Sequence, residues 1–144
     1  MYKKILVPLD GSTLAEAALP HAEAIAKSEG AEIILLRIPM MPATEFFARE
    51  PSIAVRIQQE EEAVAKKYLD TKLNELKKEK IQASIIMLEG SVPDTILGIA
   101  EETHTDMIVM SIHGRTGLKR WLIGSVADRV VHQAHSPVML IHPN

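Results

Sequence analysis

The chain has 144 residues, enough for one domain with a single core, and we expect residues 1–144 to form one domain. It has 16 Lys and Arg against 19 Asp and Glu, a net charge of −3, and only 3% aromatic residues. Nucleic-acid binders usually have a basic face or stacking aromatic side chains, so we expect no nucleic-acid partner. No apolar run approaches the roughly 18–20 residues that cross a bilayer, so we expect no membrane contact.

Cysteine is absent, which excludes disulfides, thiolate metal sites and cysteine nucleophiles. The first residues pass from Lys3 and Lys4 directly into a short apolar run, without the longer apolar region and cleavage site of a signal peptide. These two features fit a reducing compartment, and we expect a cytoplasmic protein.

Short aliphatic runs alternate with longer helical patterns, which is typical of βαβ units around a parallel sheet. Each run is nearly continuous in Ile, Leu, Val and Met, as expected for strands that are covered on both faces. The five predicted strands are 3–9, 32–38, 82–88, 106–111 and 138–142. Four helices are predicted between them, so the expected fold is a doubly wound α/β domain.

The first helix is predicted to begin after Ser12, where Thr13 and Glu16 have the spacing of a capping box, and to end near Gly30. Pro20 lies within this helix. Because an internal proline removes a helical hydrogen bond, we expect a bend at residues 17–21.

The second helix is predicted over residues 53–80, as a long surface helix whose buried stripe includes Leu69 and Leu76. On its exposed face, Glu62 and Lys66 have the spacing of an ion pair. The preceding residues 39–52 contain three prolines and two phenylalanines, and we interpret them as a mobile flap or a partner contact.

The third helix follows Pro93, because proline is tolerated in a first helical turn. The fourth is predicted to begin at Gly124 and Ser125. Its apolar stripe, which includes Val130 and Val131, is expected to pack on the sheet.

The segment 111–125 has the features of an anion-binding loop between a buried strand and a helix. Gly114 and Gly117 allow sharp turns and a close approach of the backbone to a phosphate. Gly124 and Ser125 open a helix whose free N–H groups and dipole attract negative charge. Arg115 adds a cationic side chain nearby.

Asp10 follows the first predicted strand, just as this loop follows the fourth. In parallel sheets, ligands bind outside the carboxyl ends of the strands, where the strand order reverses. If these two strands are neighbours, Asp10 lies across a crevice from the glycine loop, where it can contact a ribose hydroxyl or a phosphate-bound metal ion. From these residues alone, a phosphate site and an ordinary turn before a helix are about equally favoured.

The sequence resembles the universal stress proteins that have an adenine-nucleotide site, from end to end. The resemblance begins with Lys-Ile-Leu-Val-Pro-Leu-Asp-Gly-Ser at 4–12 and continues through Gly-Ser-Val-Pro at 90–93 to Ser-Pro-Val at 136–138. The family's phosphate motif is Gly-x2-Gly-x9-Gly-Ser/Thr. Gly114, Gly124 and Ser125 match its second half, whereas Ser111 stands in place of its first glycine.

The resemblance implies a five-stranded sheet in the order 3-2-1-4-5, a homodimer formed through residues 138–142, and ATP, with Mg²⁺, bound between strands one and four. Pro8, Leu9 and Asp10 would then line the adenosine, and Ile38 would contact the adenine. The ribose and phosphates would be held by Gly114, Gly124, Ser125 and Val126. His113 and Arg115 lie inside the motif without an assigned role.

A nucleotide-binding signalling module for the stress response is favoured over an enzyme. The sequence has no P-loop lysine and no kinase motifs, so we expect at most slow ATP hydrolysis, and the protein partner is unknown. The alternative is a dimeric stress protein that binds no nucleotide and acts as a scaffold, which Ser111 favours. AMP or cyclic AMP in place of ATP is a third possibility, because the sequence of a phosphate-binding loop does not indicate how many phosphates the ligand has.

Overall fold

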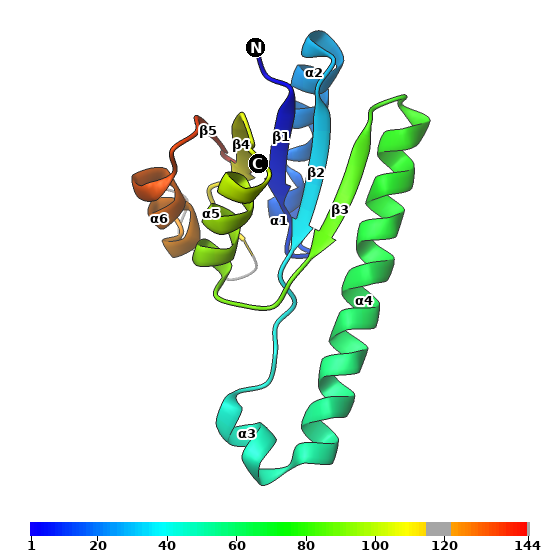
Figure 1. The fold of residues 1–144 in the computed structure, drawn as a ribbon, viewed down its shortest axis with the longest axis vertical. Helices are drawn as coiled ribbons and strands as arrows, with labels where there is room; N and C mark the ends of the chain where they lie inside the picture. Colours follow the sequence, from blue (N-terminus) through cyan, green and yellow to red (C-terminus); the bar gives the residue numbers. More distant parts are fainter. Residues whose placement is uncertain (115–121, 144) are drawn as a thin grey trace.

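The computed structural model describes residues 1–114 and 122–143, and its strands form one parallel sheet (Figure 1). The strands are β1 (Lys4–Pro8), β2 (Glu32–Arg37), β3 (Ala83–Met87), β4 (Met107–Ser111) and β5 (Val138–Ile141). Their spatial order is β3-β2-β1-β4-β5. The predicted strands and their order are confirmed, and no strand end differs from the prediction by more than one residue.

Helices cover both faces of the sheet, because alternate strand residues point to opposite sides and nearly all are apolar. In β1, Ile5 and Val7 belong to a buried cluster with residues of α2 and α4, whereas Leu6 belongs to a second cluster with residues of α5 and α6. The described residues form six helical segments, not the four predicted. These are α1 (Thr13–Glu16), α2 (Leu19–Glu29), α3 (Thr44–Arg49), α4 (Pro51–Lys78), α5 (Val92–Glu102) and α6 (Ser125–Gln133).

The predicted first helix is divided into α1 and α2, so the expected bend is confirmed. Pro20 lies in the first turn of α2, where its missing N–H costs no hydrogen bond. The N-cap is Ser12, whose Oγ accepts a hydrogen bond from Ala15 N at 3.1 Å, so the predicted capping role of Thr13 is wrong. Gly30 ends α2 in the left-handed conformation, as predicted.

Residues 39–52, interpreted as a flap, contain α3 and the start of α4. Ala54 is fully buried and Phe46 and Phe47 are half-buried where α3 packs on α4. Since α4 has 28 residues, it is about 42 Å long, and its N-terminal part projects with α3 past the carboxyl ends of the strands (Figure 1). Within the described ranges, no helix, α4 included, has the length and hydropathy needed to cross a membrane.

Two predicted features of the helix surfaces are wrong. Lys66 Nζ pairs with Asp70 Oδ2 at 2.7 Å instead of with Glu62, whose Oε1 accepts a hydrogen bond from Gln58 at 3.1 Å. Both carboxylates are four residues from Lys66, so the spacing alone did not distinguish them. Val131 of α6 is 43% exposed and does not pack on the sheet.

Asp106 ties the N-terminal segment to the start of β4. Its Oδ2 accepts hydrogen bonds from the backbone N–H groups of Lys3, at 2.8 Å, and Lys4, at 2.9 Å. These bonds favour the charged carboxylate and hold the pKa of Asp106 below its ordinary value. A lowered pKa in the folded state stabilises the fold above the unfolded-state pKa, and this stabilisation is lost as the pH falls through the folded-state pKa.

We therefore expect Asp106→Asn to lower the free energy of unfolding at pH 7 by about 1 kcal/mol. As the pH falls from about 5 toward 2, the variant should lose less stability than the parent protein, because it lacks this titrating group. Urea unfolding across this pH range measures both effects. Asp70→Asn, which alters an exposed ion pair, is the control. An unchanged acid dependence in Asp106→Asn would contradict the role given to this carboxylate.

The sheet has its topological switch point between β1 and β4, which are neighbours. The loop after β1 leads to α1 on one face of the sheet, and the loop after β4 leads toward α6 on the other. The two loops therefore diverge above the carboxyl ends of these strands. Such a divergence opens a crevice at the edge of a doubly wound sheet.

Candidate functional site

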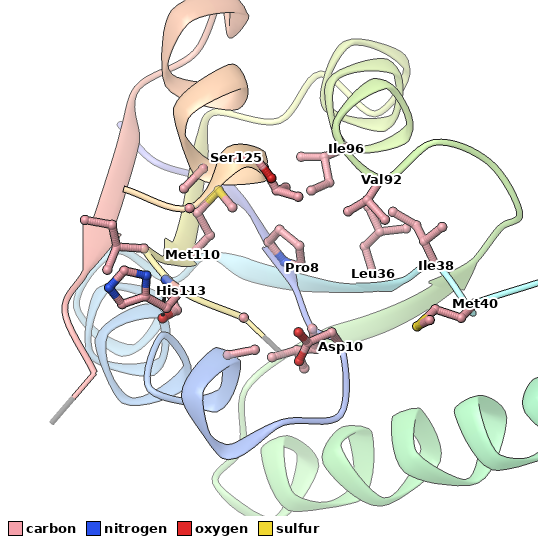
Figure 2. Close-up of a pocket in the computed structure, with 18 residues that line it drawn as sticks. Pro8, Asp10, Leu36, Ile38, Met40, Val92, Ile96, Met110, His113 and Ser125 are labelled. Atoms are coloured by element: carbon pink, nitrogen blue, oxygen red, sulfur yellow. Dashed lines mark hydrogen bonds between the residues drawn. The ribbon is translucent and has the colours of Figure 1, made fainter. Parts of the chain in front are cut away.

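A pocket of about 270 Å³ lies at this switch point (Figure 2). It is bounded by the loops after β1 and β4, the end of β2 and the first turns of α5 and α6. Ten of the predicted site residues line it: Pro8, Leu9, Asp10, Ile38, Ser111, His113, Gly114, Gly124, Ser125 and Val126. The other two, Arg115 and Gly117, lie outside the residues that the structure describes.

One end of the pocket is apolar. Figure 2 shows Ile38 and Met40, from the segment after β2, close to Val92 and Ile96 of α5. Of these four, only Ile38 was predicted as a site residue. The i,i+4 spacing of Val92 and Ile96 places both on one face of α5, but no sequence pattern indicates that this face meets the end of β2. This end can hold a flat, apolar group.

The other end is polar and contains Asp10. Its Oδ1 accepts hydrogen bonds from the backbone N of Ser12, at 2.9 Å, and from the Ser12 Oγ, at 2.6 Å. Its Oδ2 faces the loop after β4, and a Cβ placed on Gly114 would lie only 2.7 Å from this oxygen. Gly114 is therefore the residue that lets the two loops approach each other.

The start of α6 forms the facing wall. Gly124 is the N-cap, and its N–H donates a hydrogen bond to Ile112 O at 3.0 Å. A Cβ on Gly124 would lie 2.8 Å from the same oxygen, so the crossing of these two segments requires glycine. Ser125 and Val126 follow in the first turn of α6, where N–H groups have no acceptor within the helix and the dipole is positive. This wall favours an anion.

Two polar side chains are buried beside this wall. Ser111 Oγ accepts a hydrogen bond from the backbone N of His113 at 3.3 Å. The His113 side chain is also buried, and in the described part of the chain neither Nδ1 nor Nε2 has a hydrogen-bond partner. Figure 2 shows the ring turned away from Pro8 and Asp10, so His113 lines the pocket without presenting its ring nitrogens to a ligand there.

The family model for the universal stress protein family matches residues 1–142 of the chain. Universal stress protein MJ0531 of Methanocaldococcus jannaschii is 37% identical over 144 residues, covering 98% of this chain and 82% of that protein. The solved structure of protein MJ0577 from the same organism superposes with a TM-score of 0.85 at 33% identity. The superposition covers 98% of this chain and 96% of the MJ0577 chain.

Two more distant structures share the fold and contain a nucleotide. A universal stress protein in complex with cAMP has a TM-score of 0.64 at 22% identity, covering 99% of this chain and 98% of its own. A universal stress protein family protein of Arabidopsis thaliana with AMP bound has a TM-score of 0.71 at 21% identity. The match covers 99% of this chain and 92% of the Arabidopsis chain. The family match over nearly the whole chain and the similarity to MJ0531 show that this chain belongs to the universal stress protein family.

Proposed function

We propose that the protein binds an adenine nucleotide, ATP, in the pocket between β1 and β4 and acts as a signalling module of the stress response. One observation carries this proposal: a single pocket has an apolar slot at one end and is lined elsewhere by a carboxylate and a helix N-terminus. An adenine ring fits the first end, and ribose hydroxyls and phosphates fit the second. The related structures with AMP and cAMP support the choice of an adenine nucleotide.

In this proposal each end of the pocket has a defined role. Ile38 contacts the adenine, and Pro8 and Leu9 line the adenosine. Asp10 accepts hydrogen bonds from the ribose hydroxyls with the oxygen that faces Gly114. Backbone groups of the glycine loop and of the first turn of α6 hold the ribose and phosphates: Gly114, Gly124, Ser125 and Val126.

His113 precedes Gly114 in this loop, and we assign its buried ring, which is turned away from Pro8 and Asp10 (Figure 2), no contact with the nucleotide. Arg115 and Gly117 belong to the same loop by sequence. We propose that Gly117 allows the loop to turn around the phosphates and that Arg115 supplies a positive charge to them.

Mg²⁺ would bind together with the phosphates. This ion usually keeps several waters and binds phosphate oxygens, so the nucleotide itself would hold it while Asp10 contacts Ser12 and the ribose. Among residues 1–114 and 122–143, no three His, Asp or Glu side chains are grouped to hold a metal ion by themselves. The residues present therefore fit a nucleotide-bound Mg²⁺.

We propose at most slow hydrolysis of the bound ATP. Efficient phosphoryl transfer requires a positioned base for the attacking water and a cation at the transition state, and the sequence has no P-loop lysine after its glycines. Binding without turnover suits a module whose nucleotide-bound surface is recognised by a protein partner. Incubation with Mg-ATP should release phosphate at no more than a few turnovers per hour, roughly the range of slow intrinsic nucleotidases.

A nucleotide-free scaffold is the second candidate, because Ser111 replaces the first glycine of the phosphate motif. We expect Ser111→Gly to change the affinity for ATP by less than tenfold, about 1.4 kcal/mol. The serine side chain is small, and its Oγ accepts a hydrogen bond from its own loop at His113 N. Calorimetric titration of both proteins measures the difference. A much larger gain in Ser111→Gly would mean that Ser111 impairs the site, which favours the scaffold.

The choice among adenine nucleotides is tested by competition. A fluorescent ATP analogue is bound to the nucleotide-stripped protein and displaced with ATP, AMP, cAMP or GTP. The proposal expects displacement by ATP, with GTP at least tenfold weaker. Preferential displacement by AMP or cAMP would show that this nucleotide, and not ATP, is the ligand. Failure of the analogue to bind would contradict the nucleotide site.

We also propose a homodimer formed through residues 138–142. The strand β5 is at the edge of the sheet, and its residues Val138, Met139 and Leu140 are apolar but only half-buried. An exposed apolar edge strand is a template for pairing with another chain. Light scattering should give twice the mass of one chain, and a monomer at micromolar concentration would contradict this interface.

A further inference from the structure

Arg37, the last residue of β2, is a buried cation beside the candidate site. It is only 4% exposed and follows an almost uninterrupted apolar run in the strand. Burial of a guanidinium is costly unless nearby groups compensate its charge and fix its donors. Arg37 does not line the pocket, so any effect on a ligand must pass through its neighbours.

The guanidinium of Arg37 lies between an aromatic ring of α4 and the backbone after β1. Its Cζ is 5.0 Å from the centroid of the Tyr68 ring, which is the geometry of a cation–π contact. On another side, a Cβ placed on Gly11 would lie 3.0 Å from Nη1 and 3.2 Å from Cζ. Gly11 also has a positive φ of 86°, so glycine is needed there for two reasons.

Tyr68 is itself held in place by residues of α1 and α4. Its hydroxyl donates a hydrogen bond to Glu16 Oε2 at 2.7 Å, and Lys72 Nζ lies 3.1 Å from Glu16 Oε1. Burial, followed by the hydrogen bond and charge of Glu16, raises the pKa of Tyr68, so the hydroxyl stays protonated and donates throughout the physiological range. The ring is therefore a fixed surface for the guanidinium.

We propose that Arg37 is a positioning residue for nucleotide binding. Clamped against Tyr68, it supports the turn from Asp10 to Ser12 from behind and so keeps the Asp10 carboxylate oriented toward the ribose. Asp10 depends on this turn because its Oδ1 is bonded to Ser12, while its Oδ2 faces Gly114. The inference rests on the proposed nucleotide function and adds a residue outside the pocket to it.

The test compares ATP with 2′,3′-dideoxy-ATP, which lacks the hydroxyls that Asp10 would bind. In the parent protein ATP should bind at least tenfold more tightly than the dideoxy analogue. Asp10→Asn should remove most of this ratio. Arg37→Met keeps a long side chain without the charge. We expect it to lower the affinity for ATP about tenfold and to leave the affinity for the dideoxy analogue nearly unchanged, so that the ratio of the two affinities falls toward one.

Two further variants separate positioning from a general loss of structure. Arg37→Lys retains the charge without the planar guanidinium, and we expect it to restore part of the ratio. Lys27→Met removes a cation from an exposed pair with Glu79, far along α2, and should keep the parent ratio. Circular dichroism and thermal unfolding check that each variant is folded.

If Arg37→Met keeps the parent ratio, or weakens both ligands equally, Arg37 does not position Asp10 and the inference is wrong. If Arg37→Met does not fold, Tyr68→Leu decides, because it removes the aromatic ring that contacts the guanidinium; its ratio should fall two- to threefold, and an unchanged ratio overturns the inference. A parent protein that binds neither ligand contradicts the proposed function itself. A parent protein that binds both equally contradicts the role of Asp10, and the positioning role of Arg37 with it.

Discussion

We expect Gly114→Ala to lower the affinity for ATP by about 100-fold, roughly 2.7 kcal/mol. A Cβ at this position would lie 2.7 Å from Asp10 Oδ2, closer than van der Waals contact allows. Asp10 cannot move freely, because its other oxygen accepts two hydrogen bonds from Ser12. The variant must therefore displace the carboxylate or push the glycine loop away, and either change disturbs the polar end of the pocket.

Gly98→Ala is the matched control for this substitution. Gly98 lies on the exposed side of α5, and a Cβ there would meet no atom within 4 Å. Alanine also favours a helix by about 1 kcal/mol over glycine, so this variant should bind ATP normally and be slightly more stable. Calorimetric titration of both variants measures the difference. An affinity within threefold of the parent value in Gly114→Ala would show that the contact with Asp10 does not shape the site.

We expect Leu69→Ala to lower the free energy of unfolding by about 2–5 kcal/mol, because it leaves a cavity in the core. Leu69 is fully buried where α4 packs on the sheet, in the same cluster as Leu76, and both were predicted on the buried stripe. Its neighbour Tyr68 packs under the guanidinium of Arg37. A loosened α4 should therefore also weaken ATP binding.

Val64→Ala is the control on the same helix, since Val64 is 59% exposed and its truncation should change stability by less than about 0.5 kcal/mol. Urea unfolding of the two variants, followed by circular dichroism, gives both free energies. A loss below about 1 kcal/mol in Leu69→Ala would contradict the packing of α4 described above.

The sheet could be predicted because each strand has a continuous aliphatic run, and all five residues of β4 are indeed buried. The boundaries of the helices depended on details that the pattern did not contain. Ser12 caps α1 and also donates a hydrogen bond from its Oγ to Asp10, whereas the capping-box spacing indicated Thr13. Likewise, α3 forms within a proline-rich stretch and contacts α4, with Phe46 and Phe47 half-buried.

The candidate site could be located because functional residues of doubly wound sheets collect at strand ends, and Asp10 and Gly114 both follow central strands. At the apolar end only Ile38 was predicted, and Val92 and Met40 were missed because only the fold brings them together. Arg37 was missed as well. The available signal was a single cation at the end of an apolar strand. Its partners Tyr68 and Gly11 are too far away in the sequence for a local pattern to connect them with it.

Isothermal titration calorimetry of the nucleotide-stripped protein with Mg-ATP shows whether the pocket between β1 and β4 binds ATP. We expect saturable binding at one site per chain with a micromolar dissociation constant, which corresponds to a binding free energy of about −8 kcal/mol. Gly98→Ala should give the same curve, and Gly114→Ala should give little or no heat at the same concentrations. If the folded parent protein shows no heat, and the same result is obtained at several temperatures so that a zero enthalpy is excluded, the pocket between β1 and β4 is not an ATP site.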